Sequence, residues 1–324
     1  MSDFTCGFAR HLDDFVAYRI ASGRWCASGA KYLRAFDRHC TAANPDADEL
    51  TQEMIDSWCS RRETESAASC RSRCGIARRF AAWAFGRGLT DAVLPDMPRG
   101  ASQPYVPHAF TKEELARFFA ACDSDVAGNK RREICKVQCA AFFRLLYSSG
   151  IRTIEARYLK RCDVDLEDGV LNVRKSKGGD QHYVALHPTM AEVLRAYDAA
   201  AERLQPGREW FFQSSKGGGH LGCSWVDWNF ARLWRAAGGE AGAAVAYDLR
   251  HQYAVENILS WDCDAFEAHD RLLWLSKSMG HRHLSSTLYY FSVTPALAGK
   301  LLALTGDDMD RILPVEWEAE DGEA

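Results

Sequence analysis

The sequence contains no run of about 18 apolar residues, the length that a helix needs to cross a bilayer. It also lacks the basic start and apolar stretch of a secretory signal peptide, because the first residues carry Asp3, Asp13 and Asp14 instead. From these two absences we expect a cytoplasmic protein without a membrane partner.

Cysteine spacings typical of metal sites are also lacking, although the chain has 12 cysteines. Cys70 and Cys74 are four residues apart, as are Cys135 and Cys139, so neither pair is a CxxC motif. Most cysteines lie among apolar residues, where a reduced thiol acts as a small hydrophobic group. We therefore predict reduced structural cysteines and no metal.

Dinucleotide-binding and Walker-type glycine motifs are missing too, and we expect no cofactor.

Strong positive charge, the usual mark of nucleic-acid binding, is absent. The net charge is −4, but residues 307–324 hold eight Asp/Glu and one Arg. Without them, 39 Lys/Arg face 36 Asp/Glu, a net charge of +3. Charge alone therefore does not indicate a nucleic-acid partner.

Residues 1–89 have the apolar periodicity of helices. Four are expected: about Phe8–Ile20, one after Ser28, one from Thr51, and about Ser66–Phe85. The last contains a stretch with five arginines and no acidic residue: Arg71, Arg73, Arg78, Arg79 and Arg87. This stretch is either a solvated helix face or a face that contacts phosphates, and both interpretations remain open.

Proline is scarce except in residues 90–109, which hold four of the nine prolines and indicate a linker. A capping box, Thr111 with Glu114, then predicts the start of a helix. The chain thus divides into a helical N-terminal domain, residues 1–100, a second domain, residues 101–306, and an acidic tail, residues 307–324.

The second domain is predicted to be mainly α-helical with a small antiparallel β-sheet. Two segments rich in β-branched and aromatic residues, 169–175 and 181–186, flank a glycine turn and indicate a hairpin. Helices are expected at about 188–203, 223–237, 247–259, 267–279 and 283–289.

Four segments of this domain carry side chains suited to phosphodiester cleavage without a metal. Such a reaction needs a nucleophile, an acid and fixed cations, and arginine grips phosphate with a planar fork. Arg152 follows a glycine and precedes Glu155 by three residues, and Lys177 lies in the hairpin turn. Tyr247 and Arg250 share a helix face, and His281 precedes Tyr290 by nine residues. Each of these features, taken alone, more often has a structural role than a catalytic one.

Together and in order, the four segments resemble the tyrosine recombinase (phage-integrase-like) family over about residues 108–300. The family's first arginine corresponds to Arg152, and its hairpin lysine to Lys177 rather than Lys175. Its H-x-L-R-H block corresponds to Tyr247 through His251, its L-G-H block ends at His281, and its nucleophile corresponds to Tyr290.

The resemblance implies a core-binding N-terminal domain and a catalytic domain that act on duplex DNA at a specific recombination site. Tyr290 would form a 3′-phosphotyrosine. Arg152, Arg250 and His281 would stabilise the phosphate charge, and Lys177 would protonate the leaving oxygen. It also implies a homotetramer on two DNA sites, to which an apolar helix after Tyr290 would contribute. A role in a mobile element is the expectation.

One position departs from the family pattern, since Tyr247 stands where the family has histidine. A tyrosine is a poorer base at neutral pH, although its hydroxyl still bonds phosphate oxygens. His251 is expected to point about 100° away on the helix and is not assigned a role. The alternatives are a type IB topoisomerase, a telomere-resolving enzyme and a non-catalytic DNA-binding relative.

Overall fold

The structure, a computed structural model, describes residues 4–25, 27–96, 105–124, 130–174, 181–262, 265–293 and 297. The chain divides into two compact units, Met1–Tyr105 and Val106–Ala324. Lys175 and Lys177, the apolar segment after Tyr290 (except Leu297) and the acidic tail lie outside the described residues. No helix within the described ranges is both long and apolar enough to cross a membrane.

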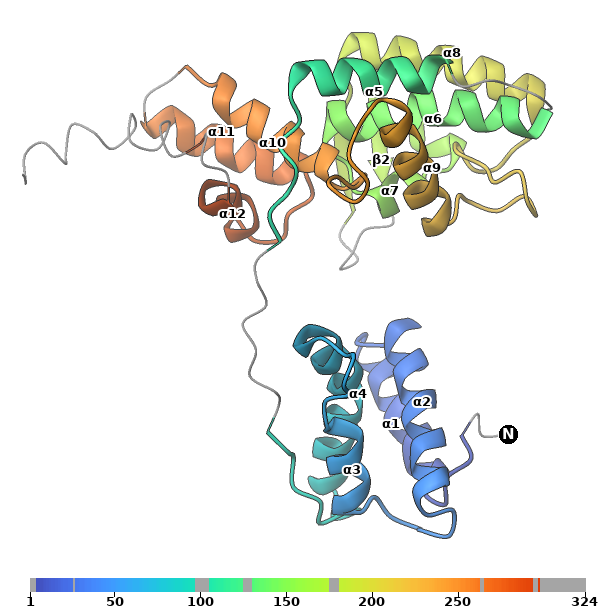
Figure 1. Cartoon of the computed structure of the whole chain (residues 1–324), viewed down its shortest axis with the longest axis vertical. Helices are drawn as coiled ribbons and strands as arrows, with labels where there is room; N and C mark the ends of the chain where they lie inside the picture. The colour runs from blue at the N-terminus through green and yellow to red at the C-terminus, as the bar shows by residue number, and fades with distance from the viewer. Residues whose placement is uncertain are drawn as a thin grey trace, which may run out of the picture. The chain divides into compact units, whose positions relative to one another are not determined.

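Within its described residues, the regular elements of the first unit are all helices, joined by irregular segments (Figure 1). Its helices are α1 (Ala9–Ala21), α2 (Ala27–Ala43), α3 (Gln52–Cys59) and α4 (Ala67–Phe85). Thr51 and Ser66 cap α3 and α4 with their side-chain oxygens. Phe80 of α4 is buried at the centre of the core, with its ring 5.6 Å from Phe15 and 6.4 Å from Phe36. These aromatic contacts join α4 to α1 and α2.

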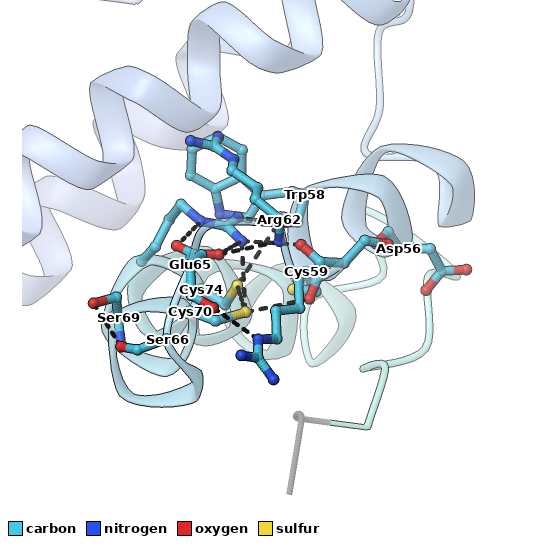
Figure 2. A network of polar contacts seen from close by, with 12 residues as sticks. Asp56, Trp58, Cys59, Arg62, Glu65, Ser66, Ser69, Cys70 and Cys74 are labelled. Atoms are coloured by element: carbon cyan, nitrogen blue, oxygen red, sulfur yellow. Dashed lines mark hydrogen bonds and ion pairs between the residues drawn. The ribbon is translucent and has the colours of Figure 1, made fainter. Parts of the chain in front are cut away.

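Arg73 of α4 donates to Glu65 and to Cys70 at the corner between α3 and α4. Figure 2 shows the polar contacts that gather around Glu65, Cys70 and Cys74 at this corner. Arg73 Nη2 lies 2.6 Å from a Glu65 carboxylate oxygen, and the same atom donates to Ser60 O at 3.0 Å. Only 5% of Arg73 is exposed, and its guanidinium holds the pKa of Glu65 down at about 2. Arg73 therefore closes this corner and does not belong to a phosphate-contacting face.

The ten cysteines within the described part of the chain have free thiols. Cys70 and Cys74 lie one helical turn apart with their Sγ atoms 3.8 Å from each other. Burial raises the pKa of Cys70 to about 11. A buried, protonated thiol packs as an apolar group.

The second unit is mainly helical with one small antiparallel sheet, as predicted (Figure 1). Its sheet consists of β1 (Val164–Asp165), β2 (Val170–Val173) and β3 (His182–Ala185), in that order. The predicted hairpin strands are confirmed as β2 and β3, which pair with Leu171 opposite Val184, while β1 was not predicted. The helices are α5 (Lys112–Ser124), α6 (Lys130–Ser149), α7 (Thr153–Arg157), a 3-10 turn (Arg161–Asp163), α8 (Pro188–Leu204), α9 (Cys223–Ala236), α10 (Asp248–Ser260), α11 (Ala265–Ser278) and α12 (Ser285–Val293).

Local sequence explains where several of these helices begin. The capping box at α5 is confirmed, since Thr111 N donates to Glu114 at 2.9 Å and Glu114 N to the Thr111 hydroxyl at 3.1 Å. Aromatic side chains of α5, α6 and α9 form the main core, in which Phe118 lies 5.0 Å from Phe230 and 5.6 Å from Phe143. This core supports the end of α6, where the candidate site begins.

Candidate active site

The site begins at the turn between α6 and α7. Gly150 closes α6 with φ +61°, a left-handed conformation that favours glycine. Arg152 is the N-cap residue of α7, and its guanidinium lies 2.5 Å from the Glu155 carboxylate. The same carboxylate accepts a hydrogen bond from Arg152 N at 2.9 Å, so Glu155 binds both the backbone N–H and the guanidinium of Arg152.

Arg250 of α10 lies at the centre of the site and is only 1% exposed. Its guanidinium donates to Gly150 O, to Met279 O at 2.9 Å and to His281 Nε2 at 2.8 Å. Arg152 donates to the neighbouring Gly280 O at 2.8 Å. The two predicted arginines therefore meet at one turn, between α11 and α12, and hold it by its backbone carbonyls.

Gly280 allows this turn to approach the sheet closely. It has φ +63°, and a Cβ atom there would lie 2.4 Å from Cε1 of His182 on β3. His182 lies in turn 3.9 Å from the Glu155 carboxylate that holds Arg152. The second strand of the hairpin, β3, is thus in contact with the arginine site.

His281 lies between Arg250 and Thr287. Its Nδ1 is 2.7 Å from the Thr287 hydroxyl, and its Nε2 is 2.8 Å from the Arg250 guanidinium. Burial, and then the charges of Arg250 and Arg152, lower the pKa of His281 to about 3. The imidazole is therefore neutral at physiological pH.

Tyr290 of α12 is 2% exposed and packs with apolar residues of α10 and α11, among them Ile258 and Leu275. Its ring stacks 6.4 Å from His281. Burial raises the pKa of Tyr290 to about 12, and the positive charge of Arg250 counteracts part of that rise. The hydroxyl is protonated in this state, so it needs a base or a cation to act as a nucleophile.

Tyr247 is the N-cap residue of α10 and is 39% exposed. Its ring lies 5.0 Å from His251, which is buried and lies 5.4 Å from Tyr290. The sequence analysis assigned His251 no role, whereas the structure places its ring beside both tyrosines. The spacing of four residues between Tyr247 and His251, which places them on one helix face, was the signal for this.

Five of the six predicted site residues lie among the described residues. The structure brings Arg152, Arg250, His281 and Tyr290 together, and it joins Tyr247 to them through His251. Lys177 falls outside the described part of the chain. The arrangement offers a tyrosine hydroxyl and fixed cations, which are the nucleophile and the charge that phosphoryl transfer without a metal requires, together with a neutral imidazole.

Acidification should destabilise the second unit. The folded protein holds the pKa of His281 at about 3 and that of His251 at about 4, both mainly by burial, whereas unfolded histidine titrates near pH 6.5. The unfolded state therefore binds more protons below about pH 6.5, and stability falls toward pH 4. The Tm between pH 7.5 and 4.5 measures this. The His251→Phe variant should show a shallower fall, and an unchanged slope would contradict the role of burial.

Replacing Gly150 with alanine should destabilise the site by at least about 2 kcal/mol. Alanine is strained at φ +61°, and its Cβ atom would lie 2.3 Å from the Tyr253 ring. Gly207→Ala is the matched control, because Gly207 has φ +69° and nothing within 4 Å of a Cβ atom. Urea unfolding of both variants separates the clash from the backbone strain. Equal losses would show that Tyr253 moves aside freely.

Comparison with known proteins gives consistent matches. Residues 108–296 match the phage integrase family. A protein of Sinorhizobium fredii described as integrase/recombinase y4rE is 32% identical over 297 residues, which cover 88% of this chain and 93% of that protein. Tyrosine recombinase XerD of Rhizobium meliloti is 26% identical over 234 residues, 70% of each chain.

Solved structures share the fold. XerH site-specific recombinase bound to palindromic difH substrate has a TM-score of 0.62 at 18% identity, over 86% of this chain and 79% of that one. The Tn1549 transposon integrase in complex with transposon right end DNA has a TM-score of 0.61 at 14% identity, over 94% and 98%.

Proposed function

The chain belongs to the phage integrase family and is a tyrosine-type site-specific DNA recombinase, and from this premise we propose that Tyr290 is its nucleophile. The substrate is duplex DNA at a specific site. Tyr290 loses its hydroxyl proton to water and attacks a phosphorus atom, a 3′-phosphotyrosine forms, and the bond to the 5′-oxygen breaks, so that a 5′-hydroxyl leaves. The observation that carries the proposal is the convergence of Arg152, Arg250 and His281 on the turn beside Tyr290.

In this proposal the arginines supply the charge that the transition state needs. Negative charge accumulates on the non-bridging oxygens, and a guanidinium keeps its charge at any physiological pH. Without DNA, Arg152 and Arg250 donate to backbone carbonyls, and a phosphate would take over some of these donors. His281 adds a further donor, and Tyr247 lies at the exposed edge, where its hydroxyl can bond a phosphate oxygen.

Rejoining follows from the energy that the phosphotyrosine conserves. The 5′-hydroxyl of a partner strand attacks the phosphotyrosine and displaces Tyr290, so the number of phosphodiester bonds is unchanged. Lys177 protonates the departing 5′-oxygen in the first step. Neither ATP nor a divalent metal is required, because bond energy is retained and the arginines stabilise the charge.

The first unit is proposed to be the core-binding domain. Without Arg73, four arginines of the 71–87 stretch remain as candidates for phosphate contacts: Arg71, Arg78, Arg79 and Arg87.

We propose that a homotetramer on two DNA sites performs the exchange and that it serves a mobile element. The likeness to an integrase/recombinase supports this role. Removing residues 294–324 should then reduce pairing of two sites more than binding to one.

A nicked suicide substrate tests the proposed function. The nick lies just beyond the cleavage position, so the short leaving fragment diffuses away and the covalent complex accumulates. Candidate sites come from the DNA that flanks the gene. We expect a protein–DNA adduct in EDTA without ATP, with Tyr290 as the modified residue. Binding without an adduct would indicate a non-catalytic relative, and relaxation of plasmids that lack a target site would indicate a topoisomerase.

A further inference from the structure

Thr287 lies in the first turn of α12 and is fully buried beside His281. Its hydroxyl oxygen is 2.7 Å from His281 Nδ1, and its backbone N–H already donates to Leu284 O at 2.8 Å. The other ring nitrogen of His281 faces Arg250 at 2.8 Å. Both nitrogens of this imidazole are therefore engaged in the DNA-free protein.

The chemistry of these partners determines where the proton lies. A guanidinium only donates hydrogen bonds, so His281 Nε2 must accept from Arg250. The neutral ring then carries its proton on Nδ1 and donates it to the Thr287 hydroxyl. In this tautomer Nε2 has no hydrogen to offer to a phosphate oxygen.

A hydroxyl differs from a carbonyl or carboxylate because it can donate as well as accept. By rotation about its Cβ–Oγ bond, Thr287 can support either tautomer of His281. A carboxylate in the same place would hold the proton on Nδ1. The residue type at this position therefore decides whether the ring can change its donor side.

We propose that Thr287 is a positioning residue that lets His281 exchange tautomers when DNA binds, an inference that rests on the proposed function. The scissile phosphate draws Arg250 away from Nε2. One proton then leaves Nδ1 and one arrives at Nε2 through water, so the charge of the ring is unchanged. The Thr287 hydroxyl rotates to donate to Nδ1, and Nε2–H donates to a non-bridging phosphate oxygen.

A neutral donor fits this site better than an imidazolium. His281 is surrounded by Arg250 and Arg152, and with burial these charges lower its pKa to about 3. A tautomer exchange avoids a third positive charge in the buried site. It also leaves the arginines as the source of positive charge at the phosphate.

Nitrogen NMR of histidine-labelled full-length protein tests the tautomers directly. We expect His281 as the Nδ1–H form without DNA. In the uncleaved complex of Tyr290→Phe with a duplex site, we expect the neutral Nε2–H form. An imidazolium, or an Nδ1–H form that persists in the complex, would overturn the proposal.

Kinetics of two variants test the role of the hydroxyl. Thr287→Val keeps the side-chain shape but leaves Nδ1 without a partner, so the single-turnover cleavage rate at saturating DNA should fall about tenfold. Thr287→Ser keeps the hydroxyl and should cleave within about twofold of the wild-type rate. The Kd for DNA should be unchanged in both variants. A merely structural role would lower the Tm and the rate in both variants, which would overturn the proposal, as would cleavage at the wild-type rate by Thr287→Val.

Different outcomes test the proposed function and the role of Thr287. Absence of an adduct in the wild-type protein overturns the proposed function itself. An adduct that forms normally in both the wild-type protein and Thr287→Val leaves the proposed function intact and removes only Thr287.

Discussion

Replacing Tyr290 with phenylalanine is expected to abolish the covalent protein–DNA adduct and to leave DNA binding within about twofold of wild type. The loss is complete in principle, because phenylalanine has no atom that can attack phosphorus. Folding should be preserved, since the Tyr290 ring packs among apolar side chains such as Ile258 and Leu275, which a phenylalanine ring also fits.

Tyr289→Phe is the matched control for this experiment. Tyr289 is the preceding residue, its ring lies 6.2 Å from that of Tyr290, and it is more exposed. Both variants are assayed with the nicked substrate, and binding is measured by electrophoretic mobility shift. An adduct in Tyr290→Phe that disappears in Tyr289→Phe would transfer the nucleophile to Tyr289.

Replacing Arg250 with lysine should lower the cleavage rate by about 100-fold or more, the cost of removing a donor aimed at a developing oxyanion. Lysine keeps the positive charge but loses the planar fork that reaches Gly150 O, Met279 O and His281 together. Those buried acceptors would lose their donor, so stability should also fall, by about 2–4 kcal/mol.

The two effects of Arg250→Lys are separated by measuring the cleavage rate well below the Tm of the variant. Arg144→Lys is the control, because Arg144 pairs with Asp123 at a partly exposed position where an ion pair contributes less than about 1 kcal/mol. A variant that is less stable but cleaves at the wild-type rate would leave Arg250 with a purely structural role.

Local patterns predicted the parts of the fold that depend on neighbouring residues. The α5 capping box and the β2–β3 hairpin were found because each involves residues close in sequence. Strand β1 was missed because two residues, Val164 and Asp165, carry too short a pattern to distinguish from a loop.

Burial set by distant residues could not be predicted in the same way. Arg73 was grouped with four other arginines because the sequence does not indicate that Glu65 lies across the corner from it. The arginines of the site were expected to face substrate, whereas Arg250 bonds carbonyls that are 100 and 29 residues away in the chain. Such partners become visible only when the elements that carry them are packed together.

The pairing of Arg73 with Glu65 also limits how salt can affect DNA binding. Each phosphate that a cationic side chain neutralises releases about 0.9 of a bound counterion, so the count of available cations sets the slope of log K against log salt concentration. The charge of Arg73 is already neutralised by Glu65 inside the protein, so Arg73 does not displace a counterion from a phosphate. The arginines of the 71–87 stretch can therefore contribute a slope of at most about 3.6, from four side chains rather than five.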